Sequence, residues 1–414
     1  MSSESPSPRV GLLYDSVSEN TGDIAIGLAG IQELERQGID DVVVLSPFDV
    51  RPESVDLTIV GGGELIRPRG DAFYDAFRPV AGDVLNAAGV WQTADDLGYL
   101  AQYEVVSARN STEAAVLAGS VDDVGVLPCT TTTLESPRFE IPGAEPGDRL
   151  IGIHVVPHTL VVCPDIVEQI NALEGRKVFI PFTHYNHDAS FMSALPFDRT
   201  DAIILPRLKP LELHSVLGQM DFVVVSSLHA SLFAYSQNVP FATVHQEKVL
   251  NYFKDRGLER FVFDGPESLR AAMTEIELGG LDFSEQVAEE KRVVNEAYAR
   301  FAALARTRAA TRQGELPAVE VDPSLAQRDA LLIEQLSHVV VGRDRVIAHD
   351  QVRLMEAEHH AQRWHDEADR LAAEIELLSA RVLEPPASTP TPPAGFKERV
   401  QRVGERAAAH FHRS

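Results

Sequence analysis

The feature that most constrains this fold is a repeated alternation of short apolar runs and helix-like segments. The runs 9–14, 42–45, 57–60 and 124–127 are largely apolar, and isoleucine and leucine recur at helical spacing between the first two. Strands that are apolar throughout belong to parallel sheets covered by helices on both faces. The pattern therefore predicts an N-terminal Rossmann-like α/β domain over residues 9–146.

The same pattern starts again after a turn-rich segment at 137–146. Further apolar runs alternate with helix-like segments and predict a second Rossmann-like domain over 147–282. The runs lie at 151–153, 178–180, 202–205, 222–225 and 241–244. Open α/β sheets bind ligands at the carboxyl ends of their strands, so the cleft between the two domains is the predicted site.

The C-terminal third of the chain has a different pattern. A long helix is predicted over 283–313, and heptads follow over 324–384. Apolar residues occupy 13 of the 15 a and d positions from Ile333 to Val382, which is enough heptads to favour a coiled coil. We expect this segment to mediate self-association, with an amphipathic helix packed on its own domain as the alternative.

The two ends of the chain are predicted to stand apart from these domains. Residues 1–8 are expected to be disordered, and residues 385–414 form a proline-rich linker and a basic tail. The stretch 396–414 has five basic and two acidic side chains, hence a charge of +3. A solvated tail is favoured, and weak contact with an anionic membrane surface is the alternative.

Charge and composition exclude several classes of protein. The net charge of −25 argues against nucleic-acid binding, which depends on lysine and arginine neutralising phosphates. Two cysteines cannot form a disulfide framework and fit a reducing compartment. With neither a signal peptide nor a run of 18 apolar residues, the expectation is a cytoplasmic protein, membrane-peripheral only if the tail binds lipid.

A glycine run at the end of one predicted strand is a candidate for anion binding. Gly61, Gly62 and Gly63 precede Glu64, and glycines there let backbone N–H groups approach an anion closely. The spacing matches neither a dinucleotide-binding nor a phosphate-loop motif, so nucleotide binding does not follow. The nearby Arg67 and Arg69 favour an anion.

Several histidines lie near predicted strand ends. His229 follows a buried strand and begins a predicted helix, where an imidazole suits proton transfer but also packs as a core residue. His184, His187 and Asp188 form a polar cleft loop rather than a zinc site, since no helix sets their spacing. His154 is a weaker candidate. No metal or cofactor is predicted.

Taken in order, these segments resemble the polysaccharide pyruvyl transferase family. The resemblance covers about residues 9–265, and a two-domain arrangement like that of GT-B glycosyltransferases is what it implies. The matching segments are Asn20-Thr21-Gly22-Asp23, Asp56 to Glu64, Ser107-Ala108-Arg109-Asn110-Ser111, Ile180-Pro181 with His184 and Asp188, Ser227 to Ala234, Val239-Pro240, Lys248 and Gly257-Leu258.

The resemblance also implies an activity. Members transfer the enolpyruvyl unit of phosphoenolpyruvate to a sugar of a cell-surface polysaccharide or its precursor, forming a pyruvate ketal. His229 matches the family's histidine and is the implied catalytic residue. The implied substrate-binding residues are Asn20, Asp23, Gly61, Gly62, Gly63, Glu64, Arg67, Arg109, His184, Asp188, Ser227 and Lys248.

This chain departs from the family pattern at two positions. Ser227 stands where the family usually has an arginine, and Pro128-Cys129 stands where it usually has Asp-Pro. Loss of an arginine weakens binding of a phosphate or carboxylate. Two alternatives therefore stay open: a GT-B type glycosyltransferase that uses a nucleotide sugar, and a non-catalytic binding or assembly scaffold.

Overall fold

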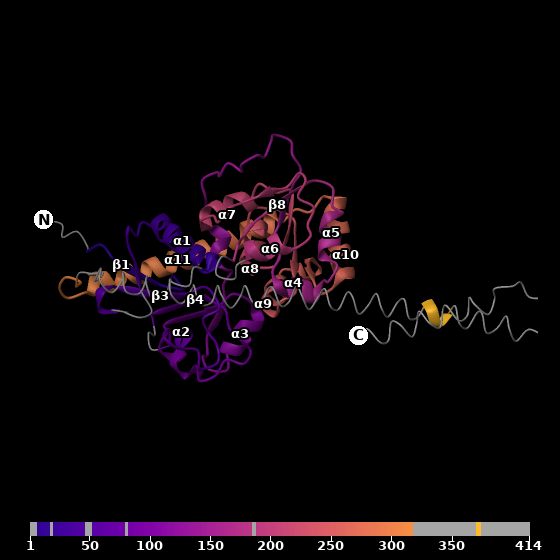
Figure 1. The fold of residues 1–414 in the computed structure, drawn as a ribbon. Helices are drawn as coiled ribbons and strands as arrows, with labels where there is room; N and C mark the ends of the chain where they lie inside the picture. The colour runs from indigo at the N-terminus through magenta and orange to yellow at the C-terminus, as the bar shows by residue number, and fades with distance from the viewer. Residues whose placement is uncertain are drawn as a thin grey trace, which may run out of the picture. The chain divides into compact units, whose positions relative to one another are not determined.

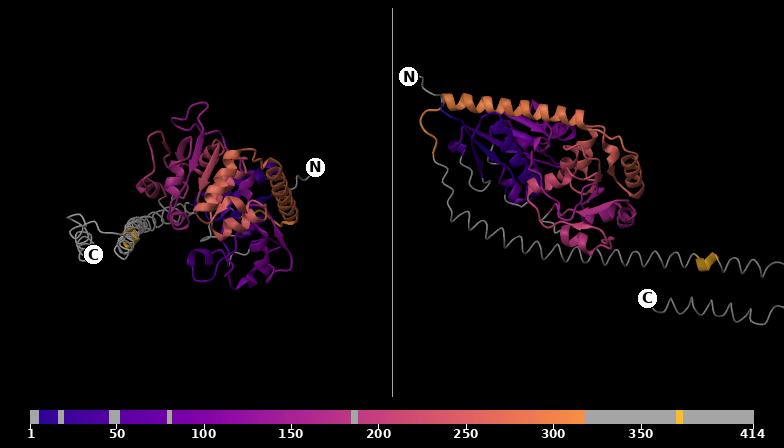
Figure 2. Two further views of the ribbon diagram at one scale, coloured as in Figure 1. Left: turned by 90° about the vertical axis from the view of Figure 1, so that its right-hand side faces the viewer. Right: turned by 90° about the horizontal axis from the view of Figure 1, so that it is seen from above.

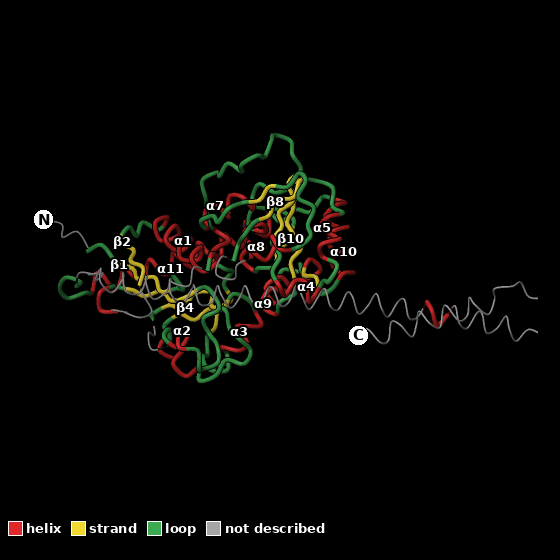
Figure 3. Tube along the Cα trace, in the orientation of Figure 1, coloured by secondary structure: helices red, strands yellow, loops and turns green. Residues whose placement is uncertain are grey.

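The structure, a computed structural model, describes residues 6–16, 20–45, 52–78, 82–183, 188–317 and 370–373. The described residues up to 317 belong to one compact unit. That unit contains two six-stranded sheets with helices packed around them (Figures 1 and 3). Every strand pair in both sheets is parallel, which confirms the predicted α/β class with two Rossmann-like sheets.

The first sheet has the strand order β2-β1-β3-β4-β5-β6. Its strands are β1 (Arg9–Leu13), β2 (Asp41–Leu45), β3 (Leu57–Gly61), β4 (Val84–Ala88), β5 (Val105–Ala108) and β6 (Val124–Val126). Its helices are α1 (Thr21–Arg36), α2 (Ala72–Asp75) and α3 (Ser111–Leu117), with 3₁₀ turns η1 (Pro52–Ser54), η2 (Leu97–Gln102) and η3 (Thr130–Thr133). The order reverses between β1 and β3, which places a ligand-binding crevice at their carboxyl ends.

The second sheet has the order β12-β11-β10-β7-β8-β9, which is the 3-2-1-4-5-6 order of the dinucleotide-binding Rossmann fold. Its strands are β7 (Leu150–Ile153), β8 (Arg176–Phe179), β9 (Ile203–Ile204), β10 (Phe222–Val225), β11 (Phe241–Val244) and β12 (Val262–Phe263). Its helices are α4 (Pro157–Val162), α5 (Ile166–Asn171), α6 (Asp188–Ala194), α7 (Pro210–Leu217), α8 (Leu228–Tyr235), α9 (Glu247–Lys254) and α10 (Pro266–Leu278), with the turn η5 (Glu259–Phe261). The crevice falls here between β7 and β10.

The first domain has an apolar core on each face of its sheet. Leu12 and Ile59 pack on one face with residues of α1, and Leu85 and Val106 pack on the other with Leu117 of α3. Both faces are thus covered, as the continuous apolar runs predict.

A long helix, α11 (Ser284–Thr311), connects the two domains. Just before it, Phe283 packs against the rings of Tyr235 and Phe241 in the second domain. Farther along, Tyr298 and Phe301 are buried in the core of the first domain. Figure 2 shows α11 running along the molecule from one domain to the other.

Strand β4, a central strand of the first sheet, is not predicted from the sequence. Its sequence, Val84-Leu85-Asn86-Ala87-Ala88, has an amide in the middle and two alanines. Asn86 is buried, and its Nδ2 donates to Thr130 Oγ1 at 3.1 Å and to Tyr298 Oη at 3.0 Å. A buried polar residue whose partners lie so far along the chain leaves no local signal.

Several predictions lie outside the described residues. They are the disordered start at 1–5, most of the heptad segment, and the proline-rich linker and tail at 385–414. His184 and His187 also lie outside them. Within the described residues, none of the helices combines the length and the apolar character needed to cross a bilayer.

Candidate active site

The carboxyl ends of the two sheets face each other across the domain boundary. Thr21, the first residue of α1, donates through Oγ1 to the carbonyl of Phe182 at 2.7 Å. Ser111, the first residue of α3, donates its N–H to Asp255 Oδ2 at 2.6 Å. Loops and helix termini of both domains therefore meet at this boundary, where the sequence predicts the site.

The start of α1 brings three candidate residues together. Asn20 is the N-cap, accepting from the N–H of Gly22 at 3.1 Å, while Asp23 lies in the first turn rather than at the cap. Asn20 Nδ2 also donates to Asp23 Oδ2 at 2.7 Å. Any β-carbon at residue 22 would overlap the imidazole of His229, so this glycine allows the second domain to pack closely on α1.

The glycine run after β3 packs on the same helix. Gly63 has a φ of +73°, and a β-carbon there would come within 2.6 Å of Asp23 Oδ1. The N–H of Gly62 donates to the carbonyl of Asn86 at 2.7 Å. That amide is thus already used, and the run serves to bring Glu64 and Asp23 close together.

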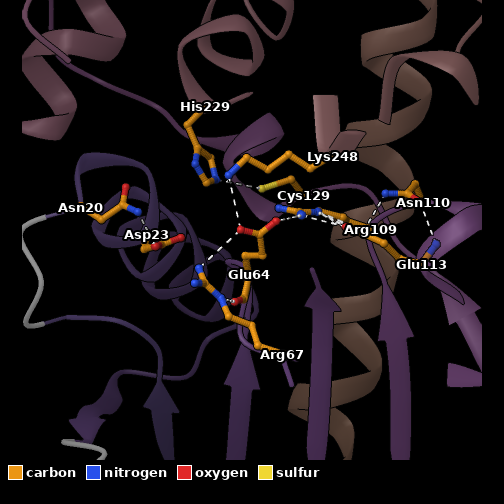
Figure 4. A network of polar contacts seen from close by, with 10 residues as sticks. All are labelled: Asn20, Asp23, Glu64, Arg67, Arg109, Asn110, Glu113, Cys129, His229 and Lys248. Carbon is orange, nitrogen blue, oxygen red and sulfur yellow. Dashed lines mark hydrogen bonds and ion pairs between the residues drawn. The ribbon is translucent and has the colours of Figure 1, made fainter. Parts of the chain in front are cut away.

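Glu64 lies at the centre of three cations (Figure 4). Its Oε2 is 3.4 Å from Lys248 Nζ and 3.4 Å from Arg67 Nη2, and its Oε1 is 3.7 Å from Arg109 Nη2. Burial opposes ionisation of Glu64, but the cations and a hydrogen bond from the Trp91 side chain outweigh it and lower its pKa. Glu64 therefore occupies the place where an anionic ligand would meet these cations.

Arg109 is enclosed by a second carboxylate. Its Nε lies 3.0 Å from both oxygens of Glu113, and its Nη2 lies 2.7 Å from Oε1. Asn110 caps α3 and also donates to Glu113 Oε2 at 2.6 Å. Burial opposes the charge of Arg109, but its carboxylate partners outweigh this and raise its pKa. The side chain is 3% exposed.

The cations differ in how accessible they are. Lys248, which enters from α9, has a side chain 34% exposed, and Arg67 is 21% exposed. Arg67 lies over the rings of Tyr74 at 3.6 Å and Trp91 at 4.8 Å. Arg69 lies elsewhere, exposed and paired with Asp96.

His229 is buried at the first turn of α8, against α1. Its Nε2 is 3.9 Å from Cys129 Sγ. Burial, with Arg109 and Lys248 nearby, lowers the pKa of His229 to about 3. The imidazole is therefore neutral at pH 7 and able to accept a proton.

The pKa of Asp23 is shifted in the opposite direction to that of His229. Burial and the neighbouring Asp15 raise its pKa to about 7, although Lys248 and Arg109 favour its ionised form. Near neutral pH this carboxyl therefore holds a proton in a substantial fraction of molecules. The site thus contains a neutral imidazole and a protonated carboxyl close together, an arrangement suited to acid–base chemistry.

Ser227 is the N-cap of α8 and is partly exposed at the same boundary. Its carbonyl accepts from the N–H of Ser231 at 3.1 Å. Its hydroxyl has no hydrogen-bond partner among the described residues. A larger side chain here would extend from the turn that carries His229.

Asp188 has a structural setting in the second domain. Its Oδ2 accepts from the N–H groups of Phe182 and Thr183, at 2.7 and 2.5 Å. It also pairs with His154 Nε2 at 2.9 Å, while His154 Nδ1 accepts from the N–H of Ser226 at 3.3 Å. The pair holds the loops after β7, β8 and β10 together, and His154, the weaker candidate in the sequence, is part of it.

Two cavities have contrasting positions. A cleft of about 420 Å³ lies between the domains and is lined in part by Glu64, Trp91, Glu113 and Lys248. A second cavity of about 500 Å³ lies between α5 and α10 and contains none of the candidate site residues. Of these two cavities, the first alone is lined by candidate site residues, namely Glu64 and Lys248.

Two side chains of the site, Glu113 and Trp91, are not predicted from the sequence. Glu113 lies in the first turn of α3, whereas Arg109 precedes the N-cap Asn110, so the pair is not a helical i,i+4 pair that the sequence spacing would reveal. Trp91 follows the strand β4 that was not predicted, and nothing local connects it with Glu64.

The chain matches one protein family. The family model described as polysaccharide pyruvyl transferase matches residues 20–244, a segment that contains every candidate site residue except Lys248. No curated protein shows a significant match.

Solved structures with similar folds are distant. UDP-GlcNAc 2-epimerase of Methanocaldococcus jannaschii has a TM-score of 0.42 at 13% identity, over 70% of this chain and 98% of that one. A mutant O-GlcNAc transferase of Thermobaculum terrenum has a TM-score of 0.33 at 14% identity, over 74% and 69%. ADP-heptose LPS heptosyltransferase II of E. coli has a TM-score of 0.34 at 9% identity, over 65% and 98%. At these values the likeness says nothing about ligands, and the GT-B-like domain arrangement stays a prediction.

Proposed function

Since the chain belongs to the polysaccharide pyruvyl transferase family, we propose that it transfers the pyruvyl group of phosphoenolpyruvate to a sugar of a cell-surface polysaccharide or its precursor. The observation that carries this proposal is that a neutral imidazole, His229, and a carboxyl with a raised pKa, Asp23, both lie near the cations that surround Glu64. A proton donor, a proton acceptor and cations for an anionic donor then lie at one domain boundary.

The reaction requires two proton transfers that such a site can provide. The methylene carbon of phosphoenolpyruvate gains a proton, and two sugar hydroxyl oxygens bond to the carbon that carried the phosphate. One hydroxyl proton replaces the proton given to the methylene group, and the other leaves with the phosphate. An acid and a base must therefore flank the donor.

The protonation states favour Asp23 as the acid and His229 as the base. A neutral imidazole takes the proton of an attacking hydroxyl, and the negative charge of a bound donor helps it keep that proton. The protonated carboxyl of Asp23 is available to the methylene carbon. Asn20, which donates to Asp23, orients this carboxyl.

The cations would hold the donor with different strengths. Lys248 and Arg67 are accessible, so they are the proposed direct partners of the donor's phosphate and carboxylate. Arg109 is held by Glu113, so its proposed contribution is its charge rather than a contact. Because Glu64 pairs with all three cations, the donor must displace its carboxylate to reach them.

A nucleotide-sugar glycosyltransferase is the second candidate function. Ser227 replaces the family's usual arginine, and each site cation already has a carboxylate partner within the described residues. Both features reduce the positive charge offered to a small, multiply charged donor. A nucleotide sugar spreads its charge over a longer molecule and depends less on such a cluster.

Direct binding separates these candidates. Calorimetric titration with phosphoenolpyruvate, and separately with UDP-, GDP- and ADP-sugars, is expected to show binding of phosphoenolpyruvate only. Phosphate release in the presence of sugar acceptors then reports transfer. Binding of a nucleotide sugar alone would establish the second candidate, and binding of neither class would point to a non-catalytic scaffold.

A further inference from the structure

We propose that the cleft between the loop after β4 and the start of α9 binds the acceptor, as a hydroxyl-rich saccharide without negative charge. The role of acceptor rests on the proposed function, whereas saccharide binding can be tested without it. None of the residues that distinguish this cleft from the donor site belongs to the segments that carry the family resemblance.

The position of the cleft suits a second substrate. Its volume of about 420 Å³ falls in the range of pockets that hold small-molecule ligands, roughly 300–1,000 Å³. One wall is residues 90–93 and the start of α3, from the first domain, and the other is the start of α9, from the second. Glu64 and Lys248 line it too, so a ligand in it would adjoin the donor site.

Trp91 gives the cleft an aromatic surface. The residue is 40% exposed, its side chain interacts with Glu64 and helps to lower the pKa of that carboxyl, and Arg67 covers one ring face at 4.8 Å. These contacts hold the ring in place before any ligand arrives. A fixed indole that combines an apolar face with a polar edge is suited to the C–H face of a sugar ring.

The remaining lining offers neutral hydrogen-bonding groups. Gln92 and Thr93 are exposed, and Asn251 is half-buried. The side chains of all three lack hydrogen-bond partners within the described part of the chain. Gln246 is oriented by its Nε2, which donates to the carbonyl of Ser226 at 2.9 Å. Side-chain amides and hydroxyls both donate and accept, as sugar hydroxyls do.

Charge favours an uncharged saccharide. The cleft is lined by Glu64, Glu113 and Glu247, against one lysine, Lys248, which pairs with Glu64. Glu247 is exposed and has no ion pair among the described residues. Arg109 pairs with Glu113, and Glu64 has its own cations, so Glu247 is the carboxylate of this lining without a cation partner in the described part of the chain. A carboxylate or phosphate on a sugar beside Glu247 would be repelled, and its binding would be penalised.

The first experiment uses Trp91 as its own reporter. The chain has two tryptophans, Trp91 and Trp364, so Trp364→Phe leaves a single indole in the full-length protein. Titration with methyl glycosides of glucose, galactose, mannose and N-acetylglucosamine is expected to change its fluorescence saturably, and glucuronic acid is expected not to. Gln92→Ala and Asn251→Ala should weaken the response, whereas Thr274→Ala, at the other cavity, should not.

The second experiment compares Trp91→Ala with Trp91→Phe in the transfer assay. The alanine variant should raise the KM for the sugar about 10- to 30-fold, the usual consequence of removing an aromatic anchor, and leave phosphoenolpyruvate affinity within about twofold. Phenylalanine keeps a ring but loses the indole N–H, so it should retain most of the acceptor affinity. Equal losses in both variants would assign Trp91 to positioning Glu64 and overturn the proposal.

The outcomes separate this proposal from the proposed function. A saturable change in Trp91 fluorescence with sugars, in a protein that does not bind phosphoenolpyruvate, would support saccharide binding in the cleft and refute the proposed pyruvyl transfer. Donor binding and transfer with a silent Trp91, and unchanged sugar KM in the alanine variant, would refute the cleft. A response equally strong for glucuronic acid would refute the stated charge preference.

Discussion

The two α/β domains differ in the side chains that they bring to their shared boundary. The first domain supplies most of the charges, and these lie in close pairs around Glu64 and Arg109. The second domain supplies neutral groups, namely the buried imidazole of His229 and the serines of the same turn. Its charges at the boundary include Lys248, which pairs with a carboxylate of the first domain, and the carboxylates Glu247 and Asp255.

The difference suggests a division of roles. Paired charges hold each other in place, so the first domain presents a rigid electrostatic surface. A neutral imidazole enclosed by the neighbouring domain is poised for proton transfer only while the domains are together. The family's usual arginine at residue 227 would have placed a cation in the second domain, and Ser227 leaves the cations mainly in the first.

Removing His229 should have the largest effect, because it tests whether the second domain carries the chemistry. His229→Ala and His229→Asn should lower kcat by about 10²–10⁴-fold, as expected for loss of a general acid or base. Phosphoenolpyruvate affinity should change little, measured by calorimetry. A fall in kcat of less than tenfold in a folded variant would transfer the role to another residue.

Breaking the charge pairing of the first domain should mainly reduce stability. Arg109→Met leaves Glu113 buried without its partner and should destabilise the protein by about 3–5 kcal/mol in urea unfolding. The double variant Arg109→Met/Glu113→Leu removes both charges and should recover most of that loss. If the single variant unfolds like the wild type while losing donor affinity, Arg109 contacts the donor directly.

Asp23 should make stability depend on pH in a defined direction. Its pKa is 3.8 as a free group and about 7 in the folded protein. Well below pH 4, the folded and the unfolded protein both keep Asp23 protonated, so this carboxyl does not reduce the free energy of unfolding. Between pH 4 and 7 the unfolded chain releases this proton while the folded protein keeps it, so the free energy of unfolding falls as the pH rises. The decrease is complete above pH 7, where both states are ionised.

Asp23→Asn should therefore stabilise the protein at pH 8 by a few kcal/mol, with an upper bound of about 4 at roughly 1.4 kcal/mol per tenfold change in the ionisation constant. The gain should vanish near pH 4. Urea unfolding of both proteins at pH 4, 6 and 8 measures it. A gain that is the same at all three pH values would show that Asp23 is ionised throughout.

Lys248 should affect donor binding more than folding. Its side chain is partly exposed, so Lys248→Met should change stability by less than about 1 kcal/mol. Loss of a charge-assisted contact worth roughly 1.5–3 kcal/mol should weaken phosphoenolpyruvate binding by about 10- to 150-fold. Lys254→Met, at the far end of the same helix, is the matched control and should bind normally.

Restoring a cation to the second domain should produce the smallest change. Ser227→Arg is expected to raise phosphoenolpyruvate affinity by up to about tenfold, one charge-assisted contact at a partly exposed position. Calorimetry measures it. If the substitution instead abolishes binding of a nucleotide sugar in a protein that never bound phosphoenolpyruvate, a different donor occupies this space.

The sequence predicted the fold well where the signal was local. The apolar runs 57–60 and 222–225 predict buried parallel strands, and the structure has β3 and β10 there. The glycine run follows the first of these strands and the start of α8 follows the second, and both carry site residues. Lys248 was named only through the family resemblance. Its contact with Glu64, 184 residues away, is a property of the assembled domains.

The protonation states and the acceptor cleft were beyond sequence reasoning. His229 and Asp23 have displaced pKa values because both are enclosed by other parts of the chain. Trp91 follows β4, and the central asparagine of that strand interrupts the apolar pattern by which buried strands are predicted. Side chains of this kind acquire their properties from neighbours that only the fold provides.

The path of α11 constrains how this protein is made. Tyr298 and Phe301 complete the core of the first domain, yet they are synthesised after the whole second domain. At roughly 5–20 residues per second, a ribosome needs on the order of 10–30 seconds to pass from the end of the first domain to the end of this helix. During that interval the nascent first domain exposes the apolar surface that α11 will cover. The core of the first domain is therefore incomplete until α11 has been translated, and cutting the gene between the domains would leave the first domain without that helix.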